Sequence, residues 1–311
     1  MLKYLKHSEI DLTLWDYCVQ NSAQPMVYAY SGYLEVSTAG NWDALVELRQ
    51  GKYVSVFPLP YKKRLGIYFT YQPFHSQQLG LFTTPESQET SVENYLKLIP
   101  KHFRKVYLQL NTENTFALGP LPRGFSSVPR VTFHLNLVYE YSVLKESFTT
   151  NLKRSIKKAK KENYEVTETQ NLPDLIKLYR QTRGKELKDV KDRHYALFEK
   201  QYAFLLQNAL VQLSEIRKNG ELIAGAVFLK QPGKLIFLFS ATSETGKQHG
   251  AMPFLLTRLI KQFAGTSTVL DFEGSSIPNL ARFYSSFGAK PVTYLSVTRN
   301  NLPWYSRWFI E

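Results

Sequence analysis

Two acidic side chains stand at the end of a predicted strand in the last third of the chain. Alternation along the strand over residues 268–272 places Asp271 and Glu273 on one face, opposite Leu270 and Phe272. A carboxylate at a strand end beside a cleft can take a proton from an attacking amine, an effect of about 10²–10⁴ on rate. A solvated strand end or a salt bridge accounts for the pattern equally well.

The short helix predicted over residues 279–286 carries a tyrosine that could also act chemically. Tyr284 precedes Gly288, the residue expected to end this helix, by four positions. A phenol, with a pKa near ~10, can protonate a departing thiolate, whose thiol has a pKa near ~8.5. Taken alone, the residue is more simply explained as a core aromatic with a hydrogen-bonded hydroxyl.

A glycine-bearing turn joins an apolar strand to an apolar helix over residues 241–253. Small residues there let a ligand approach the backbone, and the unpaired N–H groups of the helix start can bind phosphate. Pro253 fits the first helical turn, where its missing N–H would have no partner. An ordinary polar connection is the alternative. The residues that would contact phosphate are Lys247, Gln248, His249, Gly250 and Ala251.

The helix predicted over residues 151–161 is strongly basic. Leu152, Ile156 and Ala159 share one face. The remaining surface carries six basic residues, Lys153, Arg154, Lys157, Lys158, Lys160 and Lys161. Six positive charges without interleaved acids repel one another, which indicates a phosphate-bearing partner; a solvated helix face is the alternative.

Hydrogen-bonding side chains are also concentrated after a strand of the first half, over residues 71–80. Gln72, His75 and Gln77 can line a cleft between two units and orient a polar acceptor there. A loop that satisfies its own backbone hydrogen bonds is the alternative.

These residues must be positioned by helices and strands that are mixed along the chain. In the first half the pattern predicts helices at 8–20 and 91–103, turns at 50–52 and 62–64, and extended segments at 26–30, 44–48, 53–58, 66–71, 106–110 and 131–138. In the second half it predicts helices at 151–161, 172–185, 193–208, 252–263 and 279–286, and strands at 211–217, 222–229, 235–240, 268–272 and 292–298.

Both halves show antiparallel strands, one helix and a further strand, in that order. The repetition predicts two similar units, residues 1–142 and 143–311, each of an α/β or α+β class with a mixed sheet. The length of 311 residues agrees with two domains.

Composition restricts the partners. The chain has 39 Lys and Arg against 26 Asp and Glu, a net charge of +13, which attracts nucleic acid, an anionic membrane face or a phosphate-bearing cofactor. The single cysteine, Cys18, and the absence of a signal peptide favour a cytoplasmic protein. The six histidines are scattered, so no metal site is expected. No apolar run approaches the roughly 18 residues of a spanning helix.

The order of strand, glycine-bearing turn, helix, acid-bearing strand and short helix resembles the tandem fold of GNAT acyltransferases, in particular the Fem-type (FemAB-like) branch. The resemblance implies that residues 247–251 hold the pyrophosphate of an acyl-CoA and that Tyr284 is the general acid. Met252 stands where the GNAT turn has its last Gly or Ala, and Phe283-Tyr284 stands where Fem-type proteins have Phe-Lys.

The resemblance implies transfer of an acyl group from acyl-CoA or aminoacyl-tRNA to an amine, in a small molecule or a cell-wall precursor. Asp271 or Glu273 would assist the amine, and Lys153, Arg154, Lys157, Lys158, Gln72, His75 and Gln77 would contact substrates. The competing hypothesis is a degenerate, non-catalytic acyltransferase fold that binds RNA or an anionic membrane. The aromatic, basic segment 302–309 can contact lipid headgroups, or dock on its own domain.

Overall fold

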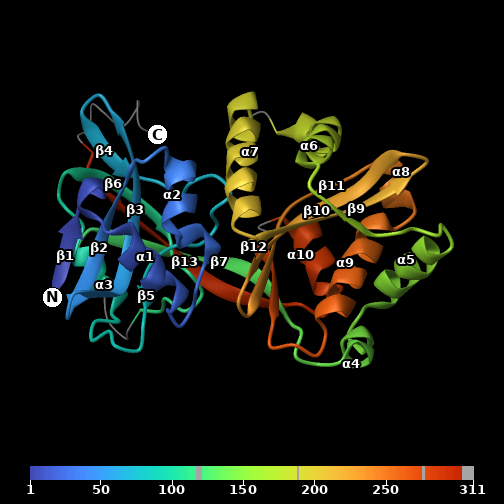
Figure 1. Ribbon diagram of the computed structural model, residues 1–311, viewed down its shortest axis with the longest axis horizontal. Helices are drawn as coiled ribbons and strands as arrows, with labels where there is room; N and C mark the ends of the chain where they lie inside the picture. Colours follow the sequence, from blue (N-terminus) through green and yellow to red (C-terminus); the bar gives the residue numbers. More distant parts are fainter. Residues whose placement is uncertain (117–120, 188, 275–276, 303–311) are drawn as a thin grey trace. The chain divides into compact units, whose positions relative to one another are not determined.

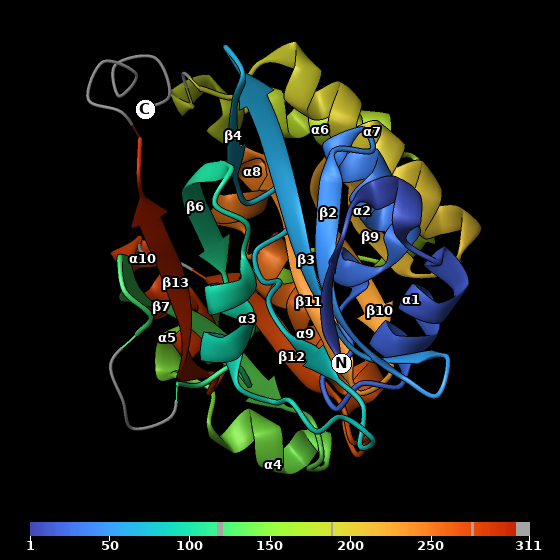
Figure 2. The ribbon, with the colours of Figure 1, turned by 90° about the vertical axis from the view of Figure 1, so that its left-hand side faces the viewer.

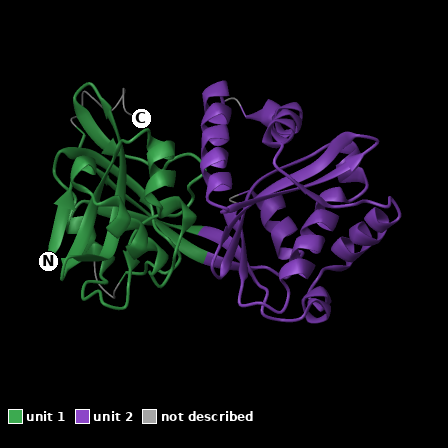
Figure 3. Cartoon of the chain, in the orientation of Figure 1, with its two compact units in different colours: residues 1–130, 293–311 green, residues 131–292 purple. Residues whose placement is uncertain are grey.

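The computed structural model describes the chain except residues 117–120, 188, 275–276 and 303–311, so most of the aromatic segment at the end of the chain lies outside the described residues. The chain forms two compact units, residues 1–130 with 293–311 and residues 131–292 (Figure 3). The division therefore falls before the boundary expected at 142/143, and the last strand returns to the first unit.

The first unit is built on a mixed sheet (Figure 1). Its elements are β1 (Leu2–Leu5), η1 (His7–Glu9), α1 (Leu12–Gln20), η2 (Val27–Ala29), α2 (Ser31–Thr38), β2 (Trp42–Arg49), β3 (Lys52–Arg64), β4 (Ile67–Thr70), β5 (Phe82–Thr83), α3 (Val92–Leu98), β6 (Phe103–Gln109), the first part of β7 (Phe125–Asn136) and most of β13 (Lys290–Asn300). Its strand order is β1-β2-β3-β4-β6-β13, with β5 paired to β3. Among the described strand pairs of this unit, β4 and β6 run parallel to each other, and the other neighbouring strands run antiparallel.

Apolar side chains alternate between the two faces of this sheet. Leu45 of β2 belongs to a core with Tyr95 and Leu96 of α3, which lies over β3 and β6 (Figure 2). Trp42, on the opposite face of β2, packs edge-on against Trp15 of α1, with ring centroids 4.8 Å apart. The sheet is therefore covered on both faces.

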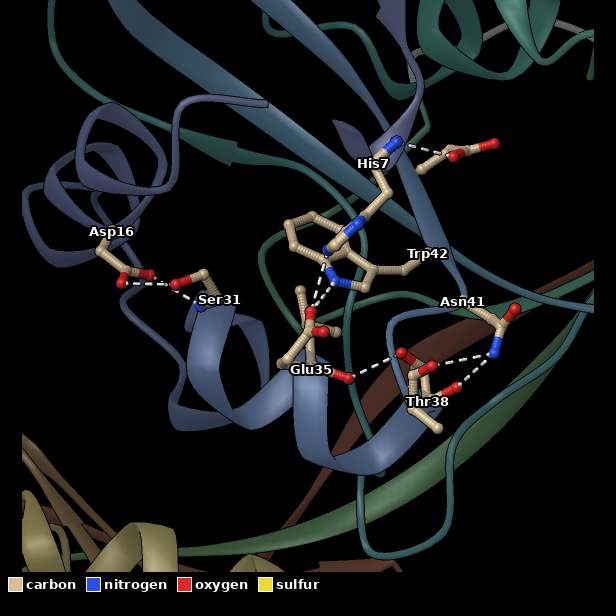
Figure 4. A network of polar contacts seen from close by, with 10 residues as sticks. His7, Asp16, Ser31, Glu35, Thr38, Asn41 and Trp42 are labelled. Carbon is tan, nitrogen blue, oxygen red and sulfur yellow. Dashed lines mark hydrogen bonds and ion pairs between the residues drawn. The ribbon is translucent and has the colours of Figure 1, made fainter. Parts of the chain in front are cut away.

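A polar network fixes α2 to its surroundings (Figure 4). The Asp16 carboxylate accepts hydrogen bonds from the backbone N–H and the hydroxyl of Ser31, both at 2.7 Å, and so caps α2 from a distant position in the chain. Glu35 Oε2 lies 2.8 Å from His7 Nε2 and accepts a 3.3 Å hydrogen bond from Trp42 Nε1. These contacts join α2 to η1 and β2.

Two predicted features of the first half are wrong. Residues 26–30, expected to be extended, contain the buried 3-10 helix η2, whose Ala29 carbonyl accepts a 2.7 Å hydrogen bond from Trp15 Nε1. The turn expected at 62–64 is the end of β3, and the chain reverses at Leu65 and Gly66, both with positive φ. The other strands and helices occur near their predicted positions, with α3 shorter than expected.

The strands of the second unit also pair in both parallel and antiparallel orientations. Its elements are the end of β7, α4 (Tyr141–Glu146), α5 (Thr150–Lys160), β8 (Thr167–Thr169), α6 (Leu172–Gln181), η3 (Arg183–Glu186), α7 (Asp192–Gln207), β9 (Val211–Lys218), β10 (Glu221–Gln231), β11 (Lys234–Thr242), α8 (Glu244–Gln248), α9 (Ala251–Phe263), β12 (Val269–Gly274), α10 (Pro278–Ser285) and the start of β13. Its strand order is β7-β12-β11-β10-β9-β8, and the pair β11 and β12 is parallel.

Helices cover both faces of the sheet in this unit as well. The main core joins α5, α9 and α10 to side chains such as Phe237 of β11 and Phe272 of β12. Phe239 of β11 instead contacts Tyr179 of α6 and Phe198 of α7, with ring centroids 4.5 and 4.8 Å away. The predicted helices and strands of this half occur near their predicted positions, except that the helix expected over 172–185 ends at Gln181 and is followed by η3. Helix α4 was not predicted, and α8 adds a short helix inside the predicted turn.

Candidate functional site

The parallel strands β11 and β12 separate part of the way along their length. They are paired at three positions, the last being Ile236 with Asp271, and β11 then runs on to Thr242 paired only with β10. A register shift between β10 and β11 leaves Leu238 without a partner, directly after the separation begins. The backbone groups of β11 that face β12 beyond this point are therefore unpaired with it, a place where a ligand chain can be bound.

The turn that follows β11 leads to a helix start. Ser243 caps α8 through a 3.0 Å hydrogen bond from the Gly246 N–H, and Gly250 has φ +72°, directly before α9. The first intrahelical hydrogen bond of α9 runs from Phe254 to the Gly250 carbonyl, so the N–H groups of Ala251 and Met252 have no helical acceptor. These donors, with the positive end of the helix dipole, suit a phosphate.

The turn packs so closely on the sheet that one of its glycines is required. A Cβ on Gly246 would lie 2.4 Å from the Ile223 carbonyl oxygen and 2.9 Å from Thr242 Cγ2. Gly246→Ala is therefore expected to lower the free energy of unfolding by about 1–3 kcal/mol, measured by urea denaturation. Wild-type stability in this variant would contradict the close contact.

The basic helix α5 lies directly against this turn. A Cβ on Gly250 would lie 2.6 Å from Ser155 Oγ and 2.7 Å from the Ser155 carbonyl oxygen, so the backbones are in contact. Leu152, Ile156 and Ala159 are buried as predicted. The basic residues Lys153, Arg154, Lys157, Lys158, Lys160 and Lys161 are exposed. The structure thus places exposed positive charge beside the phosphate-binding candidate.

Within the turn, the predicted residues differ in their accessibility. Lys247 and Gln248 are exposed, and Lys247 Nζ lies 3.5 Å from Glu244. His249 is half-buried, with Nδ1 2.6 Å from Glu162 Oε1, while Gly250 and Ala251 are buried. Lys247 and Gln248 are thus exposed to a ligand, although Lys247 is paired with Glu244, whereas His249 is half-buried and paired with Glu162.

Tyr284 lies beside the strand separation, on the face covered by α9. Its ring stacks on Phe272 with centroids 5.0 Å apart and meets Phe237 edge-on at 6.3 Å. Burial, and to a smaller extent the charge of Glu273, raise the pKa of Tyr284 above its ordinary value. The phenol therefore stays protonated and able to donate a proton.

Asp271 lies on the opposite face of β12, as the alternation predicts, and is 1% exposed. Its Oδ1 accepts hydrogen bonds from the Thr132 hydroxyl at 2.5 Å and the Glu273 N–H at 2.9 Å. His134 Nε2 and Lys234 Nζ lie 3.1 and 3.9 Å from Oδ2. Burial alone would raise the pKa of Asp271, but the hydrogen bond and charge of His134, with Lys234, outweigh it and lower that pKa.

Glu273 has a left-handed backbone, with φ +59°, which is uncommon for a residue other than glycine. The hydrogen bond from its N–H to Asp271 holds this conformation. Strained residues of this kind occur preferentially at functional sites. Asp271 therefore positions both the Glu273 backbone and the ring of His134.

His134 is the site residue that sequence reasoning missed. It lies far from Asp271 in the chain, and the six histidines show no pairing by spacing. The antiparallel pairing of β7 with β12 places the two residues directly opposite each other. The available signal was the polar His134 within the otherwise apolar predicted strand 131–138.

The corresponding parallel pair of the first unit, β4 and β6, is bridged by side chains. Beyond the last paired position, the Thr70 hydroxyl accepts a 2.9 Å hydrogen bond from the Tyr107 N–H, and Gln72 Oε1 accepts one of 3.0 Å from the Gln109 N–H. No such side-chain bridge joins β11 to β12 in the described residues. The first turn of α3 also contains Glu93, whose negative charge repels a phosphate.

The three candidate residues of the first unit lie in one loop. Gln72 also donates a 2.5 Å hydrogen bond to the Ser76 carbonyl, and Gln77 Oε1 accepts one from Gln78. His75 has φ +57°, and its carbonyl accepts a 2.6 Å hydrogen bond from Tyr33. Their contact with a substrate stays a prediction.

Among the described residues, no three His, Cys, Asp or Glu side chains are grouped so that they could hold a metal ion. Among the helices whose placement is described, none has both the length and the apolar character needed to cross a membrane.

The chain is similar to known proteins over much of its length. Residues 146–275 match the family model of the acetyltransferase (GNAT) domain. No curated protein matches the chain. Among solved structures, FemX is similar with a TM-score of 0.69 and 14% identity, over 98% of this chain and 99% of that one.

Two further structures show the same architecture. L-PGS from Bacillus licheniformis aligns with a TM-score of 0.53 and 13% identity, over 88% of each chain. A tandem GNAT protein from the clavulanic acid biosynthesis pathway aligns with a TM-score of 0.50 and 10% identity, over 97% of this chain and 99% of that one. The resemblance seen in the sequence is thus confirmed at the level of the fold: the chain has the two-unit fold of FemX and of the tandem GNAT protein, and residues 146–275 of its second unit match the acetyltransferase (GNAT) domain.

Proposed function

We propose that the protein transfers an acyl or aminoacyl group from a phosphate-bearing donor to a primary amine, in a small molecule or a cell-wall precursor. The separation of β11 and β12 beside the start of α9 is the observation that supports this best. A donor lying there would set its phosphates on the turn 247–251 and its carbonyl against the unpaired backbone of β11. Backbone N–H groups would then stabilise the tetrahedral oxyanion.

The side chains around the separation supply the remaining chemistry. Tyr284 would give a proton to the leaving group, and Asp271 or Glu273 would assist the amine, directly or through a neighbour. Lys247 and Gln248 would contact the donor's phosphates, together with the backbone of Gly250 and Ala251.

Two donors share this chemistry. Tyr284, at the position where Fem-type proteins carry a lysine, suits the thiolate of acyl-CoA, because a phenol can protonate it. The six exposed basic residues over positions 153–161, five on α5 and one at its C-cap, suit a longer polyanion such as aminoacyl-tRNA. The dependence of donor binding on salt separates the two, since only the polyanion makes many phosphate contacts.

The test compares wild type with Lys157→Glu/Lys158→Glu. For a tRNA donor, log K should fall by roughly 0.7–0.9 per phosphate contact for each tenfold rise in salt, and the variant should bind about tenfold or more weakly at low salt with a shallower slope. For acyl-CoA, the wild-type slope should be shallow and the variant's loss small.

The matched control is Lys97→Glu/Lys101→Glu, which makes the same change of charge on exposed residues of the first unit. It should leave donor binding unchanged. If neither donor is consumed with a broad panel of primary amines, the proposed transfer is wrong and the fold serves binding alone.

A further inference from the structure

His134 and Asp271 form a polar pair beside the point where β11 and β12 separate. Asp271 is the last residue of β12 that pairs with β11, and His134 lies across from it on β7. Both carboxylate oxygens of Asp271 are engaged, by Thr132, the Glu273 N–H and His134. A carboxylate held in this way orients its neighbours, and the pair's available proton acceptor is the imidazole.

The pair lies on the face of the sheet away from Tyr284. Phe133, Leu135 and Phe272 belong to the core that contains Tyr284 and α9. Alternation therefore directs His134 and Asp271 to the opposite face. A donor on the α9 face would meet Tyr284, while an acceptor approaching from the other face would meet His134.

We infer that His134 takes the proton of the acceptor amine and that Asp271 is its positioning residue, an inference that rests on the proposed acyl transfer. The hydrogen bond to Asp271 places the ring proton on Nε2 and leaves the Nδ1 lone pair available. The His134 side chain is 19% exposed, so a ligand can reach the ring. The residue also borders a pocket of about 560 Å³, which it lines together with Leu135 and Leu144 of the core.

The step balances without any further reactant. The neutral amine attacks the donor's carbonyl carbon, so that a C–N bond forms and the C–S or C–O bond to the leaving group breaks. His134 Nδ1 takes one N–H proton, and Tyr284 gives one proton to the leaving group. Exchange of one proton each with solvent restores both residues.

Among the described residues, three charged groups lie near His134 on the neighbouring strands. They are Asp271 on β12, Lys234 on β11, 3.9 Å from the Asp271 carboxylate, and Lys290 at the start of β13, which lines the same pocket. Any pH dependence assigned to His134 includes their charges, so the main variant leaves all three in place.

His134→Gln is the main variant, because the glutamine amide can still donate to Asp271 but cannot accept a proton. We expect kcat to fall about 100-fold, the donor Kd to stay unchanged, and the ascending limb of the pH–rate profile to disappear. Asp271→Asn should lower kcat less and shift that limb. The control is His194→Gln, at the N-terminus of α7, where Nδ1 accepts a hydrogen bond from the Lys191 N–H.

The outcomes separate the two proposals. If wild type acylates amines and His134→Gln keeps its kcat and its ascending limb, the role of His134 is overturned while the proposed function stands. If wild type consumes no donor, the proposed function fails, and ¹⁵N NMR of the histidine rings still decides the pairing. An Nε2–H tautomer of His134 that is lost in Asp271→Asn supports the pair, and an Nδ1–H tautomer in wild type overturns it.

Discussion

Replacing Tyr284 with phenylalanine is expected to lower the kcat of acyl transfer by about 10²- to 10⁴-fold with little change in stability. The ring packing on Phe272, at 5.0 Å and an interplanar angle of 22°, is kept by the substitution. The Tyr284 hydroxyl makes no hydrogen bond to the described part of the chain, so its removal leaves no partner unsatisfied there. The variant therefore loses a transferable proton and little else.

The measurement is kcat for the acylation of a primary amine, together with urea denaturation. Because burial and Glu273 raise the pKa of Tyr284, its deprotonation should lower activity only above the ordinary range of tyrosine. Tyr202→Phe is the control, since Tyr202 lies on α7 and its hydroxyl is buried with no hydrogen-bond partner among the described residues. Unchanged kcat in Tyr284→Phe would exclude the hydroxyl as the acid.

The second unit was predictable because its helices carry clear apolar stripes. Leu152, Ile156 and Ala159 repeat at helical spacing, and all three are buried in α5. The strand before Glu273 alternates, so that Leu270 and Phe272 enter the core and Asp271 does not. In such elements, local sequence and tertiary packing require the same structure.

In the first unit, contacts with residues distant in the sequence determine the structure of two elements, η2 and α2. Residues 26–30 form an unbroken apolar run, and a short run of this kind predicts a strand when only the sequence pattern is considered. Trp15 and Ala29 are joined by a hydrogen bond that favours the helical turn η2, and α2 is capped by Asp16 rather than by a neighbour. Contacts between distant residues therefore decide both elements.

The candidate site also combines features that are evident in the local sequence with features that depend on distant contacts. The candidate phosphate-binding turn and Tyr284 lie in one continuous segment of the chain, so their residue types and spacing could be recognised in the sequence. The surroundings of Asp271 come from β7 and β11, and neither His134 nor Lys234 can be assigned to it from sequence. The bridges made by Thr70 and Gln72 in the first unit depend equally on a strand pairing that spacing does not show.

Replacing Asp271 with alanine is expected to lower the free energy of unfolding by about 3–5 kcal/mol. The side chain is fully buried, and its loss leaves the Thr132 hydroxyl, the Glu273 N–H and the ring of His134 without their acceptor. Lys234 would also lose the negative charge that faces it. Asp271→Asn keeps the shape of the side chain and one acceptor oxygen, so this variant should be destabilised less than Asp271→Ala.

The pH dependence of this stability has a definite sign. Because the native pKa of Asp271 lies below its ordinary value of 3.8, its stabilising contribution is complete above about pH 4. The contribution is lost as the pH falls through the native pKa, so the difference between wild type and Asp271→Ala should shrink in that acid range. Urea denaturation between pH 7 and pH 2 measures it. A difference that stays constant with pH would show that the ionised carboxylate does not stabilise the fold.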